Sequence, residues 1–378
     1  MKQPHLKQIY FATLGIMLAV AGIWTSCKKE EKDTPSDDWP TDAIRTVKHG
    51  LNYPWEILWG KDDFIWMTEK LGKISKLDPK TGDVLFSSKI DEVVSVSEGG
   101  LLGMVHHPDF LNNGFIYVIY NYYNGPNYLE KVVRLTYENG TLSSPMTLIE
   151  NISASDIHNG SRLWITEENP PKLFISTGDA SNPALSQDTN SPNGKILRLN
   201  LDGTIPDDNP IAGNPMWSMG HRNPQGMVMV NGNLYVAEHG PHIEDEINII
   251  EKGRNFGWPI VNGPCDDTSE TAFCNTYNVK PPLWSSGNTF TVAGSGLDYY
   301  NGDSIPEWKN SLLLATLKNK RIYQIKLSAD GQSVVSTKEY FFDMWGRLRD
   351  FCISPAGRIY LCTSNGGTDA LIEISNPD

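Results

Sequence analysis

Short apolar runs separated by polar turns recur along most of the chain. From about residue 43 onward each run has five to eight residues, is rich in β-branched or aromatic side chains, and is bounded by Gly, Asn, Asp or Pro. Examples are Ile65-Trp-Met-Thr, Phe115 to Tyr122, Leu234-Tyr-Val-Ala and Ile359-Tyr-Leu-Cys. No stretch shows the apolar spacing of an amphipathic helix of three turns. The pattern predicts an all-β body without an internal domain boundary.

A weak repeat runs through these predicted strands. Segments of the form apolar-aromatic-apolar, followed by Thr, Ser or Glu, recur every several tens of residues. Radial repetition of four-stranded sheets lets such a chain avoid exposed sheet edges. Because propeller blades usually take about 40–50 residues, the part of the chain after residue 43 would form six long or seven short blades. The repeat therefore predicts a β-propeller without fixing its number of blades.

The composition excludes several classes of protein. Among 378 residues there are 33 Gly and 24 Pro, aromatic residues make up 10% and charged residues only 20%. Disordered chains have few aromatic residues and many charges, and helical bundles do not hold this much Gly and Pro. The net charge is 32 − 45 = −13. Without a basic run, such a chain is not expected to bind nucleic acid, because phosphate neutralisation supplies most of that affinity.

The N-terminus predicts an export signal followed by a tether. Residues 1–7 are basic and residues 9–24 are apolar, a run shorter than the ~20 residues that a spanning helix needs. Cys27 after two small residues resembles a bacterial lipoprotein processing site, although Trp24 is unusual there; an uncleaved signal anchor is the alternative. Residues 27–42 are too polar to form a core and predict a flexible tether.

Together with the strand pattern, this predicts a lipoprotein signal peptide at 1–26, a tether at 27–42 and the propeller domain at 43–378. We expect attachment to the outer membrane, on its periplasmic or cell-surface face, through lipid on Cys27 alone. The other cysteines form two pairs. Cys265 and Cys274 flank a polar loop and favour a loop-closing disulfide, whereas Cys352 and Cys362 either face each other across a hairpin or are small buried apolar residues. The absence of a Cys/His cluster from the sequence argues against a zinc site.

Four cations in polar turns suggest an anionic ligand. Arg222, Arg347 and Arg349 carry planar guanidinium groups that suit carboxylates, and Lys318 adds a further positive charge. In an acidic chain such a set predicts a small anion held at one place. The alternative is that these side chains pair with the chain's own carboxylates as structural clamps.

His158 is a candidate general base, because an imidazole titrates near neutral pH. Asp179, at the end of the next predicted strand, is placed to orient it, and the alternative is a solvated loop histidine. Gly240 and Pro241 precede an acidic run at residues 244–246. Exposed carbonyls beside a carboxylate suit Ca²⁺, and the alternative is an ordinary turn next to a solvated acidic patch.

Together these stretches closely resemble the soluble pyrroloquinoline-quinone (PQQ) dependent glucose and aldose sugar dehydrogenases, within the glucose/sorbosone dehydrogenase superfamily. The resemblance covers most of residues 48–375 and rests on about a dozen motifs in the family's order. They include EGGLLG, HPDF, HNGSRL, STGD, GHRNPQG, EHGP, DEIN, NFGWP and RLRD. The family fold is a six-bladed β-propeller with four-stranded blades, which the resemblance implies here.

The resemblance also implies roles for matching residues. His158 matches the general base that takes the proton of the anomeric hydroxyl while hydride passes to PQQ and the sugar becomes a lactone. Asp179 matches the acid that supports this base, and Arg222 the cation beside the reactive quinone oxygen. The cofactor-binding positions match Arg222, Asn223, Lys318, Arg347, Arg349 and, less closely, Thr291. The carbonyls of Gly240 and Pro241 match ligands of a Ca²⁺ that bridges protein and PQQ, and Glu246 with the carbonyl of Phe256 match a second Ca²⁺ site.

Three departures from the glucose dehydrogenase concern the substrate. Glu98 and His239 each stand where that enzyme has Gln, and Ile157 stands where it has Asp. These differences bring the chain nearer the aldose dehydrogenase branch. We expect a monomer that binds an aldose through Glu98 and His158. Its electrons would pass to an acceptor that the sequence does not identify. A non-catalytic carbohydrate-binding propeller is the alternative, but the chain keeps the base and all four cations. A metal-dependent lactonase would need several carboxylates or histidines on one metal, a set that the sequence does not offer.

Overall fold

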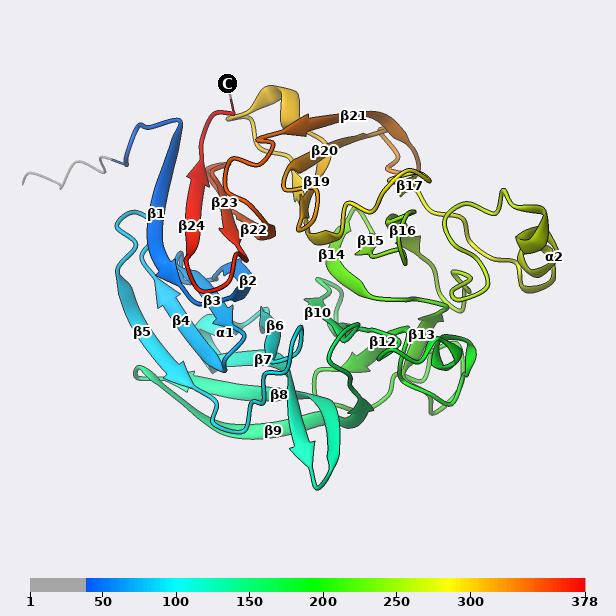
Figure 1. Cartoon of the computed structure of the whole chain (residues 1–378). Coiled ribbons are helices and arrows are strands. Elements are labelled where there is room, and N and C mark those ends of the chain that lie inside the picture. Colours follow the sequence, from blue (N-terminus) through cyan, green and yellow to red (C-terminus); the bar gives the residue numbers. More distant parts are fainter. Residues whose placement is uncertain (1–38, 378) are drawn as a thin grey trace, which may run out of the picture. The chain divides into compact units, whose positions relative to one another are not determined.

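Six antiparallel sheets of four strands each form the body of the protein. The structure, a computed structural model, describes residues 39–377, and the chain from Thr41 onward forms one unit. Figure 1 shows the sheets arranged around a centre, with β2, β6, β10, β14 and β22 nearest the middle. The predicted six-bladed β-propeller is therefore confirmed. The predicted signal peptide, Cys27 and most of the predicted tether lie outside the described residues.

From the centre outward, the sheets are as follows. In five of them the strands follow chain order. The first sheet holds β2 (Pro54–Trp59), β3 (Ile65–Glu69), β4 (Lys73–Leu77) and β5 (Val84–Lys89), and the second holds β6 (Leu101–His106), β7 (Phe115–Asn124), β8 (Asn127–Glu138) and β9 (Thr141–Ser153). The third holds β10 (Gly160–Ile165), β11 (Lys172–Thr177), β12 (Lys195–Asn200) and β13 (Met216–Met219), the fourth holds β14 (Pro224–Val230), β15 (Asn233–Glu238), β16 (Glu246–Ile250) and β17 (Trp284–Ser285), and the fifth holds β18 (Gly294–Tyr300), β19 (Ser311–Thr316), β20 (Ile322–Leu327) and β21 (Val334–Tyr340). The sixth holds β22 (Leu348–Ile353), β23 (Ile359–Thr363), β24 (Asp369–Ile374) and β1 (Ile44–Leu51).

The first and last strands close the ring. β1 pairs antiparallel with β24, and Ile44 lies opposite Ile374. At the centre each innermost strand contacts the next, from β2 through β6, β10, β14 and β18 to β22 and back to β2. These strands approach closely, since a Cβ on Gly226 would lie 2.4 Å from the carbonyl oxygen of Ser295 in β18. A glycine at this position therefore lets two blades meet at the axis.

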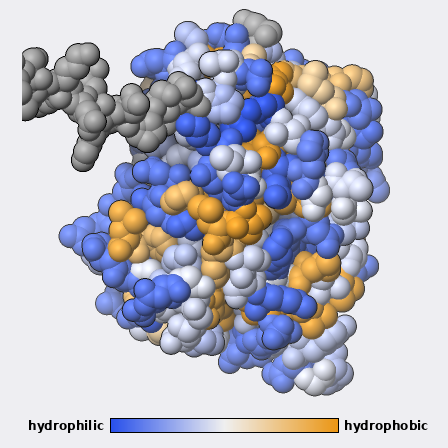
Figure 2. All heavy atoms as spheres, turned by 90° about the vertical axis from the view of Figure 1, so that its left-hand side faces the viewer, coloured by the Kyte–Doolittle hydropathy of each residue, from blue (hydrophilic) through white to orange (hydrophobic). Residues whose placement is uncertain are grey.

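Apolar side chains fill the spaces between neighbouring sheets. Val228 and Tyr235 of one sheet pack in a single buried cluster with Leu312 and Leu314 of the next. Successive side chains of a strand point to opposite faces, so in β11 Leu173 and Ile175 pack with Ile119 of one neighbouring sheet, whereas Phe174 packs with Met227 of the other. Figure 2 looks onto the side where β1 and β5 lie and shows apolar patches between hydrophilic residues; Leu85 of β5 is among the exposed apolar side chains.

A buried ion cluster links three inner strands near the axis. The guanidinium of Arg162 in β10 binds Glu56 of β2 at 2.7 Å and Asp350 of β22 at 3.0 Å. Burial raises the pKa of both carboxyls, and the guanidinium opposes that rise. Removing one member would leave an uncompensated buried charge, so this cluster fixes the relative positions of the blades.

The helices are short, and they lie between strands. They are α1 (Phe110–Asn113), α2 (Thr268–Tyr277) and the 3₁₀ segments η1 (Pro183–Gln187) and η2 (Pro306–Trp308). The stretch that the sequence presents as a polar loop contains α2, which begins after Asp267, whose carboxylate accepts from the N–H of Ser269. Cys265 and Cys274 are disulfide-bonded. None of the helices within residues 39–377 has the length and apolar character that crossing a membrane would require.

Candidate active site

The predicted site residues gather at one end of the propeller. Antiparallel strands alternate in direction, so the turns before each innermost strand lie at the same end as the turns after its neighbour. These turns contain His158 before β10, Asp179 after β11, Arg222 and Asn223 before β14, Gly240 after β15, Thr291 before β18, Lys318 after β19 and Arg347 before β22. Residues far apart in sequence therefore surround the mouth of the axis.

His158 and Asp179 form a hydrogen-bonded pair. The Nδ1 atom of His158 lies 2.9 Å from Oδ1 of Asp179, whose side chain is fully buried, whereas the histidine side chain is 15% exposed. The carboxylate is acceptor-only, so Nδ1 carries the proton and Nε2 presents its lone pair. Within residues 39–377, Nε2 has no hydrogen-bond partner. The pair therefore has the form of a general base oriented by an acid.

Trp258 holds the second oxygen of the same carboxylate. Its indole Nε1 donates to Oδ2 of Asp179 at 2.9 Å, and its ring lies 5.3 Å from the guanidinium carbon of Arg222. The backbone N–H of Asp179 also donates to the carbonyl of Arg222 at 2.9 Å. Asp179 is therefore fixed on several sides, and Trp258 links the base to the nearest cation.

The backbone of His158 is held in an uncommon conformation. Its φ angle is +62°, a region that few residues other than glycine adopt. The N–H of His158 donates to the carboxylate of Glu98 at 3.2 Å, and a Cβ on Gly178 would lie 1.9 Å from the carbonyl oxygen of His158. The loop thus depends on a carboxylate on one side and on a glycine on the other, which places Glu98 beside the base.

Several buried nitrogen atoms of the site lack partners within residues 39–377. They are Nδ2 of Asn223, Nε of Arg222, Nε of Arg349 and Nε2 of His239. Asn223 is fully buried, and its Oδ1 accepts from the N–H of Gly160 at 3.1 Å, so its amide nitrogen is the end left open. Unpaired buried donors are costly. Their concentration here indicates a place prepared for an acceptor-rich ligand.

Burial also disfavours the charged form of two of the cations, Arg222 and Arg349. It lowers the pKa of Arg222 and lowers that of Arg349 to about 10, although nearby carboxylates, including Glu98, oppose the shift. One terminal nitrogen of Arg349 donates to Gln225 at 2.8 Å and to Ser295 at 3.0 Å, which holds its side chain rigidly. Neither arginine forms an ion pair within residues 39–377. The structural-clamp alternative is therefore wrong for these two residues.

Arg347 and Lys318 lie nearer to the surface. Both side chains are exposed, and Arg347 donates to the carbonyl of Leu317, next to Lys318, at 3.5 Å. Thr291 uses its hydroxyl to donate to Oδ1 of Asp245 at 3.1 Å. The structure therefore brings Arg222, Asn223 and Arg349 into the interior of the site and leaves Arg347 and Lys318 at its rim.

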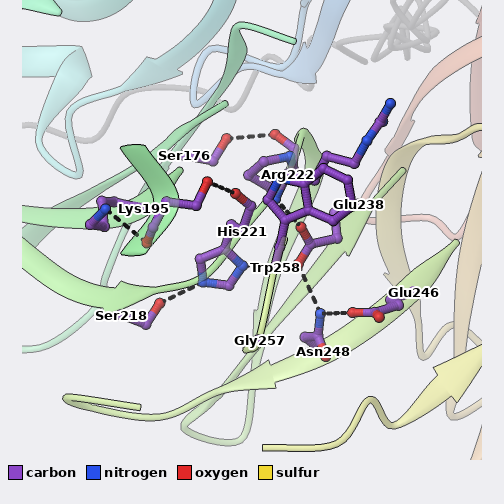
Figure 3. A network of polar contacts seen from close by, with 12 residues as sticks. Ser176, Lys195, Ser218, His221, Arg222, Glu238, Glu246, Asn248, Gly257 and Trp258 are labelled. Atoms are coloured by element: carbon purple, nitrogen blue, oxygen red, sulfur yellow. Dashed lines mark hydrogen bonds and ion pairs between the residues drawn. The ribbon is translucent and has the colours of Figure 1, made fainter. Parts of the chain in front are cut away.

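A second histidine network lies directly beneath Arg222 (Figure 3). Nδ1 of His221 lies 2.9 Å from Oε1 of Glu238, and its Nε2 lies 2.8 Å from the hydroxyl of Ser218. Glu238 also accepts from the backbone N–H of Arg222 at 2.8 Å. Asn248 extends the chain of contacts from Glu238 to Glu246, with bonds of 2.9 and 2.8 Å. This network positions the backbone of Arg222 from below.

Three of the four predicted metal-ligand residues border a small cavity next to that network, and Pro241 is not among its lining residues. Gly240, Glu246 and Phe256 line it together with Glu238 and Glu244. Burial, together with the charges of Glu238 and Glu244, raises the pKa of Glu246 to about 8. Within residues 39–377 no three His, Cys, Asp or Glu side chains form an arrangement suited to a metal ion. The turn at Gly240 is held instead by Asp245, whose Oδ1 accepts from the N–H of Gly240 at 3.1 Å.

Trp258, Glu238 and Asp245 lie in the motifs NFGWP, EHGP and DEIN, but the sequence predicts no role for Trp258 or Glu238. Asp245 belonged to the acidic run interpreted as a cation site or a solvated patch. The structure instead buries Asp245 at 1% exposure, where Oδ2 accepts from the N–H groups of Val292 and Ala293. A buried aspartate joins two loops here, which no local sequence signal shows.

The chain matches a known family over most of its length. The match to the family described as Glucose / Sorbosone dehydrogenase spans residues 51–372. The chain belongs to this family. Quinoprotein glucose dehydrogenase B of Acinetobacter calcoaceticus is 31% identical over 85% of each chain. An aldose sugar dehydrogenase of Escherichia coli is 29% identical over 87% of this chain and 91% of the relative.

Solved structures agree with this membership of the glucose/sorbosone dehydrogenase family. The PQQ-bound form of an aldose sugar dehydrogenase from Streptomyces coelicolor is 29% identical, with a TM-score of 0.75, over 88% of this chain and 98% of that one. The apo-form of the soluble aldose sugar dehydrogenase from Escherichia coli is 27% identical, with a TM-score of 0.78, over 89% and 99%. In both cases the similarity covers most of this chain and nearly all of the other.

Proposed function

We propose that this chain is a PQQ-dependent dehydrogenase that oxidises an aldose at the anomeric carbon to its lactone. The observation that carries the proposal is the open Nε2 of His158 within a group of buried, unpaired nitrogen donors. Its quinoprotein and aldose dehydrogenase relatives support the same class of reaction. An aldose fits the looser preference suggested by Glu98 and His239 at the two positions where the related glucose enzyme has Gln.

The chemistry of the donors fits PQQ. This flat molecule carries three carboxylates, and Asn223, Arg222 and Arg349 each present a buried nitrogen without a partner within residues 39–377. Carboxylates bound by guanidinium and amide groups form charge-assisted hydrogen bonds, the stronger kind. When bound, PQQ supplies an electrophilic quinone carbonyl that accepts hydride. Arg347, Lys318 and Thr291 would complete its surroundings at the rim.

The residues of this chain would divide the proton chemistry between them. Nε2 of His158 accepts the proton of the anomeric hydroxyl as the C–H bond gives up hydride, so one proton and one hydride leave the sugar. Asp179 holds Nδ1–H and stabilises the imidazolium that forms. Arg222 provides positive charge where negative charge develops, and because it is partly buried this charge is less screened by water than a surface charge.

We extend the proposal to Ca²⁺. The carbonyls of Gly240 and Pro241 would hold one ion next to the cofactor. Glu246 and the carbonyl of Phe256 would hold a second ion. The raised pKa of Glu246, caused by burial and two neighbouring carboxylates, supports a cation at this cavity. Oxygen ligands of this kind are those that Ca²⁺ prefers.

The test is reconstitution of residues 28–378 with PQQ and Ca²⁺. Heat stability should rise with PQQ concentration, as expected for a ligand that binds only the folded state, and an artificial electron acceptor should be reduced when glucose or another aldose is added. Protein that neither binds PQQ nor gains stability from it would instead be the non-catalytic carbohydrate-binding propeller.

We also propose an anchored, monomeric protein. Residues 1–26 would be removed and Cys27 acylated, which would hold the enzyme on the outer membrane while it passes electrons to an unidentified acceptor. Cells that express Cys27→Ser should release the protein from membranes. Light scattering of residues 28–378 should give the mass of one chain, and the mass of a dimer would overturn the monomer.

A further inference from the structure

A pocket of about 570 Å³ opens between two blades at the end of the propeller opposite His158. His158 precedes β10 and Arg222 precedes β14, whereas Thr166 and Asn231 follow these same two strands. Six strand residues span roughly 17–20 Å, so the length of the blade separates the pocket from the active site. It is a distinct cavity, of a volume that suits a small ligand.

Aromatic side chains form the walls of this pocket. Trp164, Phe174 and Trp217 line it, and both tryptophans are only half-buried. Trp164 lies opposite Phe174 in adjacent strands, and the ring of Phe174 meets Trp217 edge-on at 5.6 Å. These rings come from three strands of one sheet, so the pocket has apolar walls in place before any ligand enters.

A fixed charge network supports the aromatic wall. The guanidinium of Arg198 lies 4.7 Å from the ring of Trp217 and binds Asp208 at 2.8 Å and Asn209 at 3.2 Å. It also contacts Glu168 at 3.5 Å. The positive charge of Arg198 is therefore already matched by carboxylates, which makes the pocket a poor place for an anion.

Other polar groups at the pocket are free to bind. Within residues 39–377 no hydrogen bond engages the side chains of Glu167 and Asn231 or the indole N–H groups of Trp164 and Trp217. Unpaired donors and acceptors thus border aromatic faces. A pyranose ring has the same two-sided character, because its C–H groups form an apolar face while its hydroxyls donate and accept at the edge.

We propose that this pocket is a second saccharide-binding site, which takes one or two pyranose units of a neutral oligosaccharide. The rings of Trp217 and Trp164 would stack on the sugar, while Glu167 and Asn231 would bind its hydroxyls. The carboxylates Glu167, Glu168 and Asp208 outnumber the cations, which are Arg198 and Lys252, whose amino group lies 5.9 Å from the ring of Trp217, so acidic sugars are disfavoured. Because the pocket is remote from His158, this site would hold a saccharide without taking part in its oxidation.

The test uses residues 28–378 without PQQ, so it does not depend on the proposed redox function. Maltotriose, cellotriose and mannotriose are titrated separately while protein NMR or tryptophan fluorescence is recorded. We expect dissociation constants on the order of 1 mM for at least one of them, and about a tenfold weakening in Trp217→Ala, since aromatic contacts in binding sites contribute on this scale.

Trp284→Ala is the matched control. Trp284 is also a half-buried tryptophan in an outermost strand, β17 of the next sheet, where it packs on Tyr323. The Trp284→Ala variant should bind the trisaccharides as the wild type does. A further variant, Asn231→Ala, should weaken binding without altering the aromatic wall. The proposal is overturned if none of the trisaccharides binds, or if Trp284→Ala loses binding to the same extent as Trp217→Ala.

Once PQQ reconstitution is available, turnover of free glucose separates the two sites. Trp217→Ala should keep its turnover and glucose KM within about twofold, because the pocket and the base lie at opposite ends of the strands. A loss of turnover in Trp217→Ala with unchanged trisaccharide binding would overturn the second site while leaving the proposed redox function in place.

Discussion

His158 and His221 each lie 2.9 Å from a carboxylate, yet their surroundings differ at the other ring nitrogen. Nε2 of His221 meets the hydroxyl of Ser218 at 2.8 Å and the residue is fully buried. Nε2 of His158 has no partner within residues 39–377 and the side chain is partly exposed. A histidine with both nitrogens occupied can only support structure, whereas one with a single free lone pair can accept a proton.

The largest expected effect comes from removing the free nitrogen. In reconstituted enzyme, His158→Ala should lower turnover by about 10²-fold or more, the usual scale for loss of a general base, while PQQ still binds. Turnover per bound PQQ is the measurement. His49→Ala, which alters an exposed histidine of β1, is the control. Full turnover in His158→Ala would show that another group accepts the proton.

A smaller effect should follow when only the support of the base is changed. Trp258→Phe keeps a ring beside Arg222 but removes the hydrogen bond to Oδ2 of Asp179. With one donor fewer, the carboxylate of Asp179 is held less firmly, so the imidazole of His158 should be less well oriented for proton transfer. We expect about a tenfold fall in turnover at neutral pH. A change in KM alone would contradict this role.

The second histidine should affect folding more than chemistry. His221→Gln leaves the buried carboxylate of Glu238 with one donor fewer, so the free energy of unfolding should fall by about 1–3 kcal/mol. Turnover per bound PQQ should change by less than about tenfold. Urea unfolding and turnover together check this. The contrast between the two histidines fails if turnover collapses while the unfolding free energy stays the same.

The smallest effect on turnover is expected from a buried carboxyl, Glu130, whose protonation changes the stability of the fold instead. Glu130 accepts from the hydroxyl of Ser161, and burial raises its pKa to about 8. The folded state therefore keeps a proton that the unfolded chain loses near its ordinary value of 4.5. Raising the pH from about 5 to 8 should lower the free energy of unfolding, by up to ~1.4 kcal/mol per pH unit for this proton. Glu130→Gln, which retains an acceptor, should flatten the pH dependence of urea unfolding by that amount, and an unchanged slope would contradict the assignment.

The strand pattern predicted the blades because short apolar runs and Gly/Pro turns are local signals. The contacts that complete the site are not local. Trp258 and Asp179 are 79 residues apart and meet only through the closed ring. The helix α2 escaped prediction since Cys274 is its only buried residue. All four cations were predicted to bind a ligand, but only the structure distinguishes the buried Arg349 and the partly buried Arg222 from the exposed Arg347 and Lys318.

Cys352 and Cys362 show why the spacing of two cysteines does not establish whether they form a disulfide. Cys352 lies opposite Tyr360 in the β22–β23 pair, and Cys362 lies opposite Asp350. The hairpin register thus offsets the two thiols, which remain free and buried. Of the two alternatives that the sequence left open, the structure selects small apolar residues over a bridge.

The pairing of β1 with β24 also governs when the protein can become complete during synthesis. Ile44 and Ile374 are 374 − 44 = 330 residues apart, and a ribosome adds ~5–20 residues per second. Roughly 15 to 65 seconds therefore separate the emergence of the two strands. Throughout that interval β1, the outer strand of the last sheet, has no partner, and the blades already synthesised form an open arc instead of a closed ring. The nascent chain must be kept from pairing with a neighbour until its own final strand arrives.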